Sequence, residues 1–154
     1  MVSSLSVIGL GKLGAPMAAC FAAGGFRVKA VDLSSQKVEA INRGVAPVHE
    51  PGLEELIREA RSFLEATQNT GEAVYASEAT FVVVGTPSEE SGGFSLQYVL
   101  PTCEAIGRAL ATKEGFHLVV LTSTVMPAEA SPVTKPHPAL CVRFIRFLGR
   151  LGWS

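Results

Sequence analysis

The sequence predicts an α/β fold: a doubly wound parallel sheet with helices on both faces, in three layers. Short apolar runs alternate with helix-like segments from residue 4 to about residue 124. One of these runs, residues 81–84 (FVVV), is apolar without interruption, as is typical of a strand covered on both faces. Such strands pair in parallel, with a helix in each crossover.

The first third of the chain gives the clearest pattern. Residues 5–9 and 27–33 are expected to be strands. Residues 12–24 are expected to form a helix whose many alanines allow close packing on a sheet, and Pro16 falls in its first turn, where proline is tolerated. Ser34 opens a second helix, which Gly44 ends.

The rest of the alternation is less regular. A third helix is predicted from the spacing of Leu53, Leu56, Ile57 and Leu64. Residues 73–76 are expected to form a brief strand, residues 96–111 a helix, and residues 117–121 a further buried strand.

Composition narrows the function classes. The chain has 154 residues, 47% of them hydrophobic, and a formal net charge of −1, which favours one domain and gives no electrostatic reason to expect nucleic acid or a membrane as partner. No apolar stretch approaches membrane-spanning length, so we expect a soluble, cytoplasmic protein. Cys20, Cys103 and Cys141 are expected to be reduced thiols in the core, and no metal site is expected.

The spacing of Gly9, Gly11 and Gly14 is GxGxxG, placed between a predicted strand and a predicted helix. In that context the first glycine permits a tight turn, the second lets a pyrophosphate approach the backbone, and the third lets helix and strand pack closely. Asp32 ends the second strand, where a carboxylate can accept the ribose hydroxyls of NAD and repel the 2′-phosphate of NADP. The sequence thus predicts a Rossmann-like NAD site, against the alternatives of a ligand-free turn and a surface acid.

Four segments resemble the UDP-glucose/GDP-mannose dehydrogenase family, the nucleotide-sugar dehydrogenases. The first, GLGKLGAPMA, is also similar to β-hydroxyacid dehydrogenases. The later segments favour the nucleotide-sugar family, and they are VDLSSQKVEAINRGVAPVHEPGLEELI, VVVGTPSEESGGFSLQYVL and VLTSTVMP. They occur in the family's order over about 125 residues.

The resemblance implies roles for individual residues. Asp32 would bind the adenosine ribose, with Lys37 beside it, and Thr124 would be catalytic by holding a water or hydroxyl near the reacting carbon. Lys12 departs from the tyrosine that many members carry, and Glu50 is expected to be structural. The implied cofactor-binding set is Gly9, Leu10, Gly11, Lys12, Leu13, Gly14, Asp32, Lys37, Gly85, Thr86, Pro87, Ser123 and Thr124.

In the family, the reaction oxidises the C6 alcohol of a UDP- or GDP-sugar to a carboxylate with two NAD, through a nucleophilic cysteine that comes later in the chain. Cys141 does not resemble that cysteine's segment. We therefore expect residues 1–127 to form an NAD-binding domain that is inactive alone. Residues 128–154 read as a divergent basic tail, poorly ordered or produced by a frame change, which makes the chain a truncated enzyme.

Other functions remain open from the sequence. A small dehydrogenase of the β-hydroxyacid type would need a catalytic lysine on a later helix, and Lys135 lies between prolines instead. A non-catalytic dinucleotide-binding module would keep the glycine loop and Asp32. A subunit that pairs with a complete enzyme, or a homo-oligomer, is also compatible with the sequence.

Overall fold

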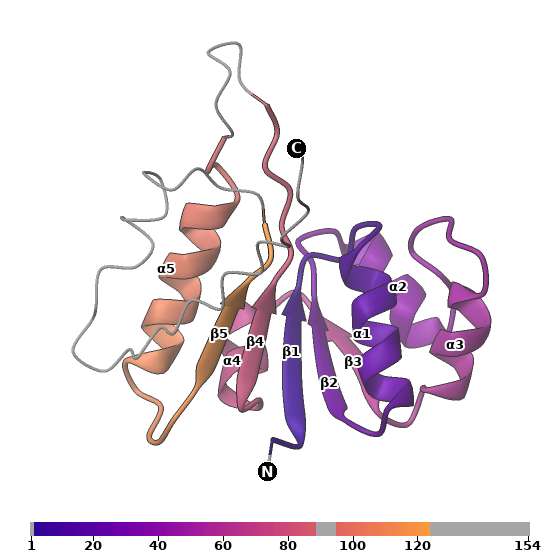
Figure 1. Cartoon of the computed structure of the whole chain (residues 1–154), viewed down its shortest axis with the longest axis horizontal. Helices are drawn as coiled ribbons and strands as arrows, with labels where there is room; N and C mark the ends of the chain where they lie inside the picture. Colours follow the sequence, from indigo (N-terminus) through magenta and orange to yellow (C-terminus); the bar gives the residue numbers. More distant parts are fainter. Residues whose placement is uncertain (1, 89–94, 124–154) are drawn as a thin grey trace, which may run out of the picture.

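The computed structural model describes residues 2–88 and 95–123. Five strands of this part form one parallel sheet, in the order β3-β2-β1-β4-β5 (Figure 1). The strands are β1 (Ser4–Ile8), β2 (Arg27–Val31), β3 (Leu64–Thr67), β4 (Ala79–Val82) and β5 (Leu118–Leu121). The predicted α/β class and parallel pairing are confirmed.

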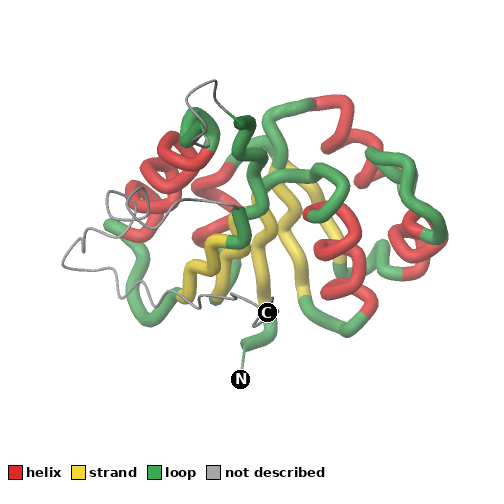
Figure 2. The backbone as a smooth tube through the Cα atoms, turned by 45° about the horizontal axis from the view of Figure 1, so that its top comes forward, coloured by secondary structure: helices red, strands yellow, loops and turns green. Residues whose placement is uncertain are grey.

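Helices cover both faces of this sheet, which gives the three predicted layers (Figure 2). Because side chains alternate along a strand, Val7 packs into one core cluster and Ile8 into the other. The first cluster includes residues of α1 (Gly14–Ala23), α2 (Ser35–Arg43) and α3 (Leu53–Glu59). The second includes residues of α4 (Thr70–Tyr75) and α5 (Val99–Leu110).

The order of the strands reverses between β1 and β4, which are neighbours in the sheet although 70 residues of chain separate them. Backbone hydrogen bonds continue past the strand ends here: Gly9 N donates to Val31 O at 2.7 Å, and Val83 N donates to Ile8 O at 2.8 Å. The loops after β1, β2 and β4 therefore leave the sheet at one edge from fixed positions.

Two predictions about the middle of the chain were wrong. Leu64 does not continue the third helix but begins β3, where it is the partner of Val28. Residues 73–76 do not form a strand, because residues up to Tyr75 belong to α4, whose N-cap Asn69 accepts a hydrogen bond from Glu72 N at 3.0 Å. The Asn-x-x-Glu spacing was a helix-start signal in the sequence, whereas β3 depends on pairing with a strand more than thirty residues earlier.

Asn42 protects the free edge of β3. Its side-chain amide donates to Ala66 O at 2.9 Å and accepts from Ala66 N at 2.8 Å, as a neighbouring strand would. Edge strands with unpaired backbone groups invite association with other chains, so this contact lets β3 end the sheet.

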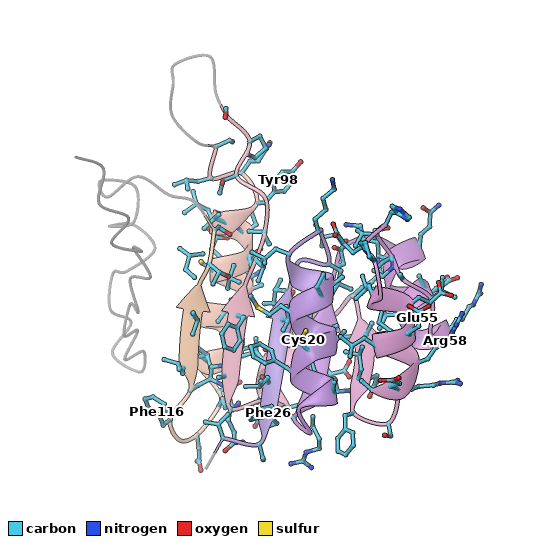
Figure 3. All side chains as sticks on the ribbon, turned by 45° about the vertical axis from the view of Figure 1, so that its right-hand side comes forward. Cys20, Phe26, Glu55, Arg58, Tyr98 and Phe116 are labelled. Carbon is cyan, nitrogen blue, oxygen red and sulfur yellow. The ribbon has the colours of Figure 1, made fainter. Side chains whose placement is uncertain are left out.

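Two further expectations can be compared with the described residues. Cys20 is exposed on α1 rather than part of the core (Figure 3). Cys103 on α5 is half-buried. Within residues 2–88 and 95–123, no helix is both long and apolar enough to cross a membrane.

Candidate functional site

A cavity of about 540 Å³ opens at the carboxyl ends of the strands, beside the point where the strand order reverses. Ligands of open α/β sheets bind at such points, because the loops on either side diverge there. Its walls come from the loops after β1, β2 and β4 and from the start of α5. The lining residues are Ile8, Gly9, Gly11, Val31, Asp32, Leu33, Ser34, Lys37, Thr70, Val83, Val84, Gly85, Gln97, Tyr98, Pro101, Thr102 and Ala105.

The glycine loop forms the floor of the cavity, and its three glycines differ in their surroundings. Gly9 has φ +102°, and a Cβ there would lie 2.7 Å from Val83 O. A Cβ on Gly14 would lie 1.8 Å from Gly9 O, so this position brings α1 against the strand. A Cβ on Gly11 would meet no atom within 4 Å, which leaves open space for a ligand to approach the backbone.

Asp32 is held in place by the loops on either side of it. Its Oδ2 accepts from Leu10 N at 2.8 Å and pairs with Lys37 Nζ at 3.2 Å, and its Oδ1 accepts from Ser34 N at 2.9 Å. The carboxylate side chain is only 13% exposed. These donors fix the carboxylate at the cavity wall while Oδ1 keeps a lone pair for a ligand hydroxyl.

Hydroxyl side chains after β5 extend its contact with β4. Thr122 Oγ1 donates to Val82 O at 2.8 Å, and Ser123 Oγ donates to Val84 O at 2.6 Å. Because the Ser123 proton is used in this bond, the Ser123 oxygen can act toward a ligand only as an acceptor. Ser123 therefore positions the backbone just before Gly85.

The structure brings together some of the predicted site residues. Gly9, Gly11, Asp32, Lys37 and Gly85 line the cavity. Leu10 contributes a backbone amide, since its side chain is buried in the core. The remaining described residues of the predicted set do not line the cavity, namely Lys12, Leu13, Gly14, Thr86, Pro87 and Ser123. Thr124, the predicted catalytic residue, lies outside the described residues, as does the tail 128–154.

Sequence reasoning missed the outer walls of the cavity. Leu33 is 81% exposed and Tyr98 is 47% exposed, and both line the opening. Tyr98 stands at the end of the molecule where the strands end (Figure 3). Leu33 could have been found, since it follows Asp32 directly, but only the tertiary structure brings the start of α5 to the cavity.

The side chains around the cavity indicate which kind of cofactor it can bind. Within the part of the chain that the structure describes, no group of three or more histidine, cysteine or acidic side chains could hold a metal ion. Cys20 and Cys103 do not line the cavity, and burial raises the pKa of the Cys103 thiol to about 11. The cavity instead offers open backbone at Gly11 for phosphate oxygens, a fixed carboxylate at Asp32 for a ribose, and apolar walls for a base, which together fit a dinucleotide.

Comparisons with known proteins agree with this fit. The profile of the UDP-glucose/GDP-mannose dehydrogenase family, NAD binding domain, matches residues 3–139. GDP-mannose 6-dehydrogenase from Pseudomonas aeruginosa is 41% identical over 134 residues, which are 86% of this chain and 31% of that protein. UDP-glucose 6-dehydrogenase AglM from Haloferax volcanii is 41% identical over 133 residues, again 86% of this chain and 31% of the relative.

Solved structures show the same relationship. A ternary complex of the Pseudomonas aeruginosa GDP-mannose dehydrogenase superposes with a TM-score of 0.81 at 41% identity, covering 84% of this chain and 30% of the other. A UDP-glucose dehydrogenase from Pyrobaculum islandicum gives a TM-score of 0.81 at 39% identity, covering 94% and 34%. This chain thus spans about a third of the length of its relatives. The chain belongs to the UDP-glucose/GDP-mannose dehydrogenase family, as the NAD-binding domain of a nucleotide-sugar dehydrogenase, and its cofactor is NAD.

Proposed function

We propose that this chain is the NAD-binding part of a nucleotide-sugar 6-dehydrogenase, which oxidises the C6 alcohol of a UDP- or GDP-sugar to a carboxylate. We propose further that the 154 residues bind NAD but do not oxidise the sugar by themselves. The observation that carries the proposal is the Asp32 carboxylate, held by Leu10 N, Ser34 N and Lys37 at the wall of a cavity floored by Gly11.

Each part of the cavity has a separate task in this proposal. The backbone around Gly11 and the amino end of α1 bind the pyrophosphate, because unpaired amides and the helix dipole favour negative charge. Asp32 accepts a hydrogen bond from the adenosine ribose, while its charge disfavours a 2′-phosphate. Leu33 and Tyr98 enclose the adenine with apolar and aromatic surface.

At the nicotinamide end of the proposed site, fewer of the expected residues belong to the described part of the chain. NAD, when bound, would supply the hydride acceptor for the alcohol carbon. Ser123 fixes the turn before Gly85 through Val84 O, and we propose that this turn and Thr124 lie beside the nicotinamide. Neither described cysteine lines the cavity, and the raised pKa of Cys103 opposes the thiolate that a covalent step needs. This supports the proposal that neither of these two cysteines is the nucleophile of the covalent steps.

Calorimetric titration of the purified chain with NADH tests the binding. We expect saturable one-to-one binding that Asp32→Ala weakens at least tenfold, because the ribose hydroxyls lose their acceptor. Glu39→Ala is the matched control, since it removes an exposed carboxylate of α2 that pairs with Arg43, one turn further along the same helix. Circular dichroism of each variant separates loss of the site from loss of the fold.

Each outcome has a defined meaning. No binding heat from a chain that circular dichroism shows to be folded would refute the proposed site. Equal weakening by Asp32→Ala and Glu39→Ala would refute the role of Asp32. We expect no reduction of NAD when UDP-glucose or GDP-mannose is added to the wild-type chain, and sustained turnover would refute the proposed inactivity.

A further inference from the structure

A second polar cluster lies at the end of the sheet opposite the cavity. It comprises Ser6 of β1, Ser77 between α4 and β4, Thr80 of β4, Lys113 after α5, and His117 before β5. Ser6, Ser77 and Thr80 are almost wholly buried, and His117 is 9% exposed. In Figure 3, Phe116, the neighbour of His117, lies at the bottom of the molecule, whereas Tyr98 of the cavity lies at the top.

These five side chains are connected by hydrogen bonds without a gap, and we call them the polar chain. Lys113 Nζ lies 3.0 Å from His117 Nδ1, and His117 Nε2 lies 2.8 Å from Thr80 Oγ1. Thr80 Oγ1 lies 2.6 Å from Ser6 Oγ, which lies 3.0 Å from Ser77 Oγ. Ser77 Oγ in turn lies 2.8 Å from Ala73 O, a carbonyl of α4.

The chemistry of the lysine end fixes the direction of the bonds as far as Ser6. A lysine ammonium can only donate, so His117 Nδ1 must accept and His117 Nε2 must carry the proton. His117 then donates to Thr80, whose single proton goes to Ser6.

The far end of the polar chain is Ser77, which contacts Ser6 and the backbone of α4. Ser6 receives the proton of Thr80 and also accepts from Ser77 Oγ, whose hydroxyl lies within reach of the carbonyl of Ala73 as well. Ser77 is the donor in both of these contacts, so the bonds from the two ends of the polar chain meet at Ser6, which accepts from both sides.

Lys113 has no spare donor in this arrangement. Besides His117, its ammonium donates to Val74 O at 2.8 Å and to Ser77 O. These two carbonyls lie at and just beyond the end of α4, where a positive charge is favourable. Lys113 is therefore held facing His117 Nδ1.

We propose that the polar chain is an acid-sensitive clasp, which joins β5 and the end of α5 to β1 and β4 only while His117 is neutral. A proton on His117 Nδ1 would replace the acceptor with a donor that faces the Lys113 ammonium at 3.0 Å. The two cations would repel each other, and the Lys113–His117 bond would be lost. β5 would open first, because in the described part of the chain it pairs with β4 alone.

The charges around His117 agree with this geometry. Burial, and then the charge of Lys113, lower the pKa of His117 to about 4, against a smaller opposite effect of the Ser77 carbonyl. Glu78 is the acid whose charge acts on Lys113, and it is exposed and hydrogen-bonded to Ser3 and Ser4 instead of to the imidazole. Thr80 and Ser6, which face the ring from β4 and β1, carry no charge.

The direction of the pH effect follows from the two states of His117. In the unfolded chain it takes up a proton below about pH 6.5, whereas in the folded chain it does so only near pH 4. Stability is therefore lost as the pH falls through this window. From these two pKa values, the unfolding equilibrium constant rises about 25-fold between about pH 7.5 and pH 5 through this residue.

Urea unfolding of the full chain at these two pH values tests the clasp. In His117→Gln, whose amide can accept from Lys113 and donate to Thr80 without titrating, we expect most of the 25-fold rise to disappear. His49→Gln is the matched control, because His49 is an exposed histidine in the loop before α3, and it should keep the wild-type rise. Equal rises in the wild type and in His117→Gln would overturn the proposal.

A second measurement on the wild-type chain covers the case in which His117→Gln fails to fold. Two-bond ¹H–¹⁵N correlation spectra at about pH 7.5 distinguish the two neutral tautomers and the imidazolium. We expect a proton on His117 Nε2 and none on Nδ1, and in Lys113→Met we expect His117 to become protonated at a higher pH than in the wild type. The opposite tautomer, or a charged His117 near pH 6, would overturn the proposal.

Discussion

Alanine substitutions at Gly14 and Gly11 distinguish two roles of the glycine loop, which are close packing of α1 and binding of the pyrophosphate. At Gly14 a Cβ would lie 1.8 Å from the carbonyl oxygen of Gly9, where ordinary contacts are no shorter than about 3.0 Å. The oxygen belongs to the backbone of a residue whose own amide is bonded to Val31 O. The loop must therefore shift by more than about 1 Å or the helix must tilt.

The cost can be estimated from the structure. Overpacking typically costs about 1–3 kcal/mol and more where backbone has to move, so Gly14→Ala should destabilise the fold by about 2–4 kcal/mol. For a chain of this size, that lowers Tm by about 6–12 °C. Gly107 in α5 is the matched control, because a Cβ there meets no atom within 4 Å and Gly107→Ala should raise Tm slightly.

Gly11→Ala should leave the stability almost unchanged and weaken the binding of NADH. Within the described residues, nothing beyond the glycine's own chain neighbours lies within 4 Å of a Cβ at this position, so we expect Tm to stay within about 2 °C of the wild type. The methyl group would occupy the space proposed for the pyrophosphate, and NADH affinity should fall at least tenfold. Differential scanning calorimetry and NADH titration measure the two effects separately. An unchanged Tm for Gly14→Ala, or undiminished NADH binding by Gly11→Ala, would refute this account of the loop.

Three further predictions concern the cavity walls and the start of β1. In competition titrations, Asp32→Asn should lower the ratio of NADH affinity to NADPH affinity at least tenfold. The substitution removes the charge that repels a 2′-phosphate and leaves Lys37 to face it. An unchanged affinity ratio would contradict this. Tyr98→Ala should weaken NADH binding about tenfold. It should weaken ADP-ribose binding equally, because we place the tyrosine ring against the adenine. Weaker binding of NADH alone would contradict this placement of Tyr98. Hydrogen bonds from Ser3 and Ser4 lower the pKa of Glu78 to about 2, so its carboxylate stabilises the fold above about pH 4.5 and stops doing so as the pH falls towards 2. Glu78→Gln should therefore be less stable than the wild type at pH 7 in urea unfolding, and a difference that persisted at pH 2 would contradict the assignment.

Local sequence patterns determined much of this protein. The apolar run before Gly9, the spacing of the three glycines and the acid at Asp32 were sufficient to predict a parallel sheet with a dinucleotide site, because each is a short-range requirement of one turn or one strand end. Gly44 ends α2 as expected for the same reason. These features need no knowledge of distant residues.

Long-range contacts decided the rest. β3 exists because Leu64 and its neighbours pair with β2. The outer wall of the cavity exists because Tyr98, the N-cap residue of α5 and 66 positions after Asp32, is brought to the same opening. The serines of β1 look like ordinary strand residues in the sequence, yet the side chain of the buried Ser6 bonds to Thr80 and Ser77, which lie more than seventy residues away in the chain. A buried polar group needs a partner wherever the chain supplies one, and only the tertiary structure decides which residues meet.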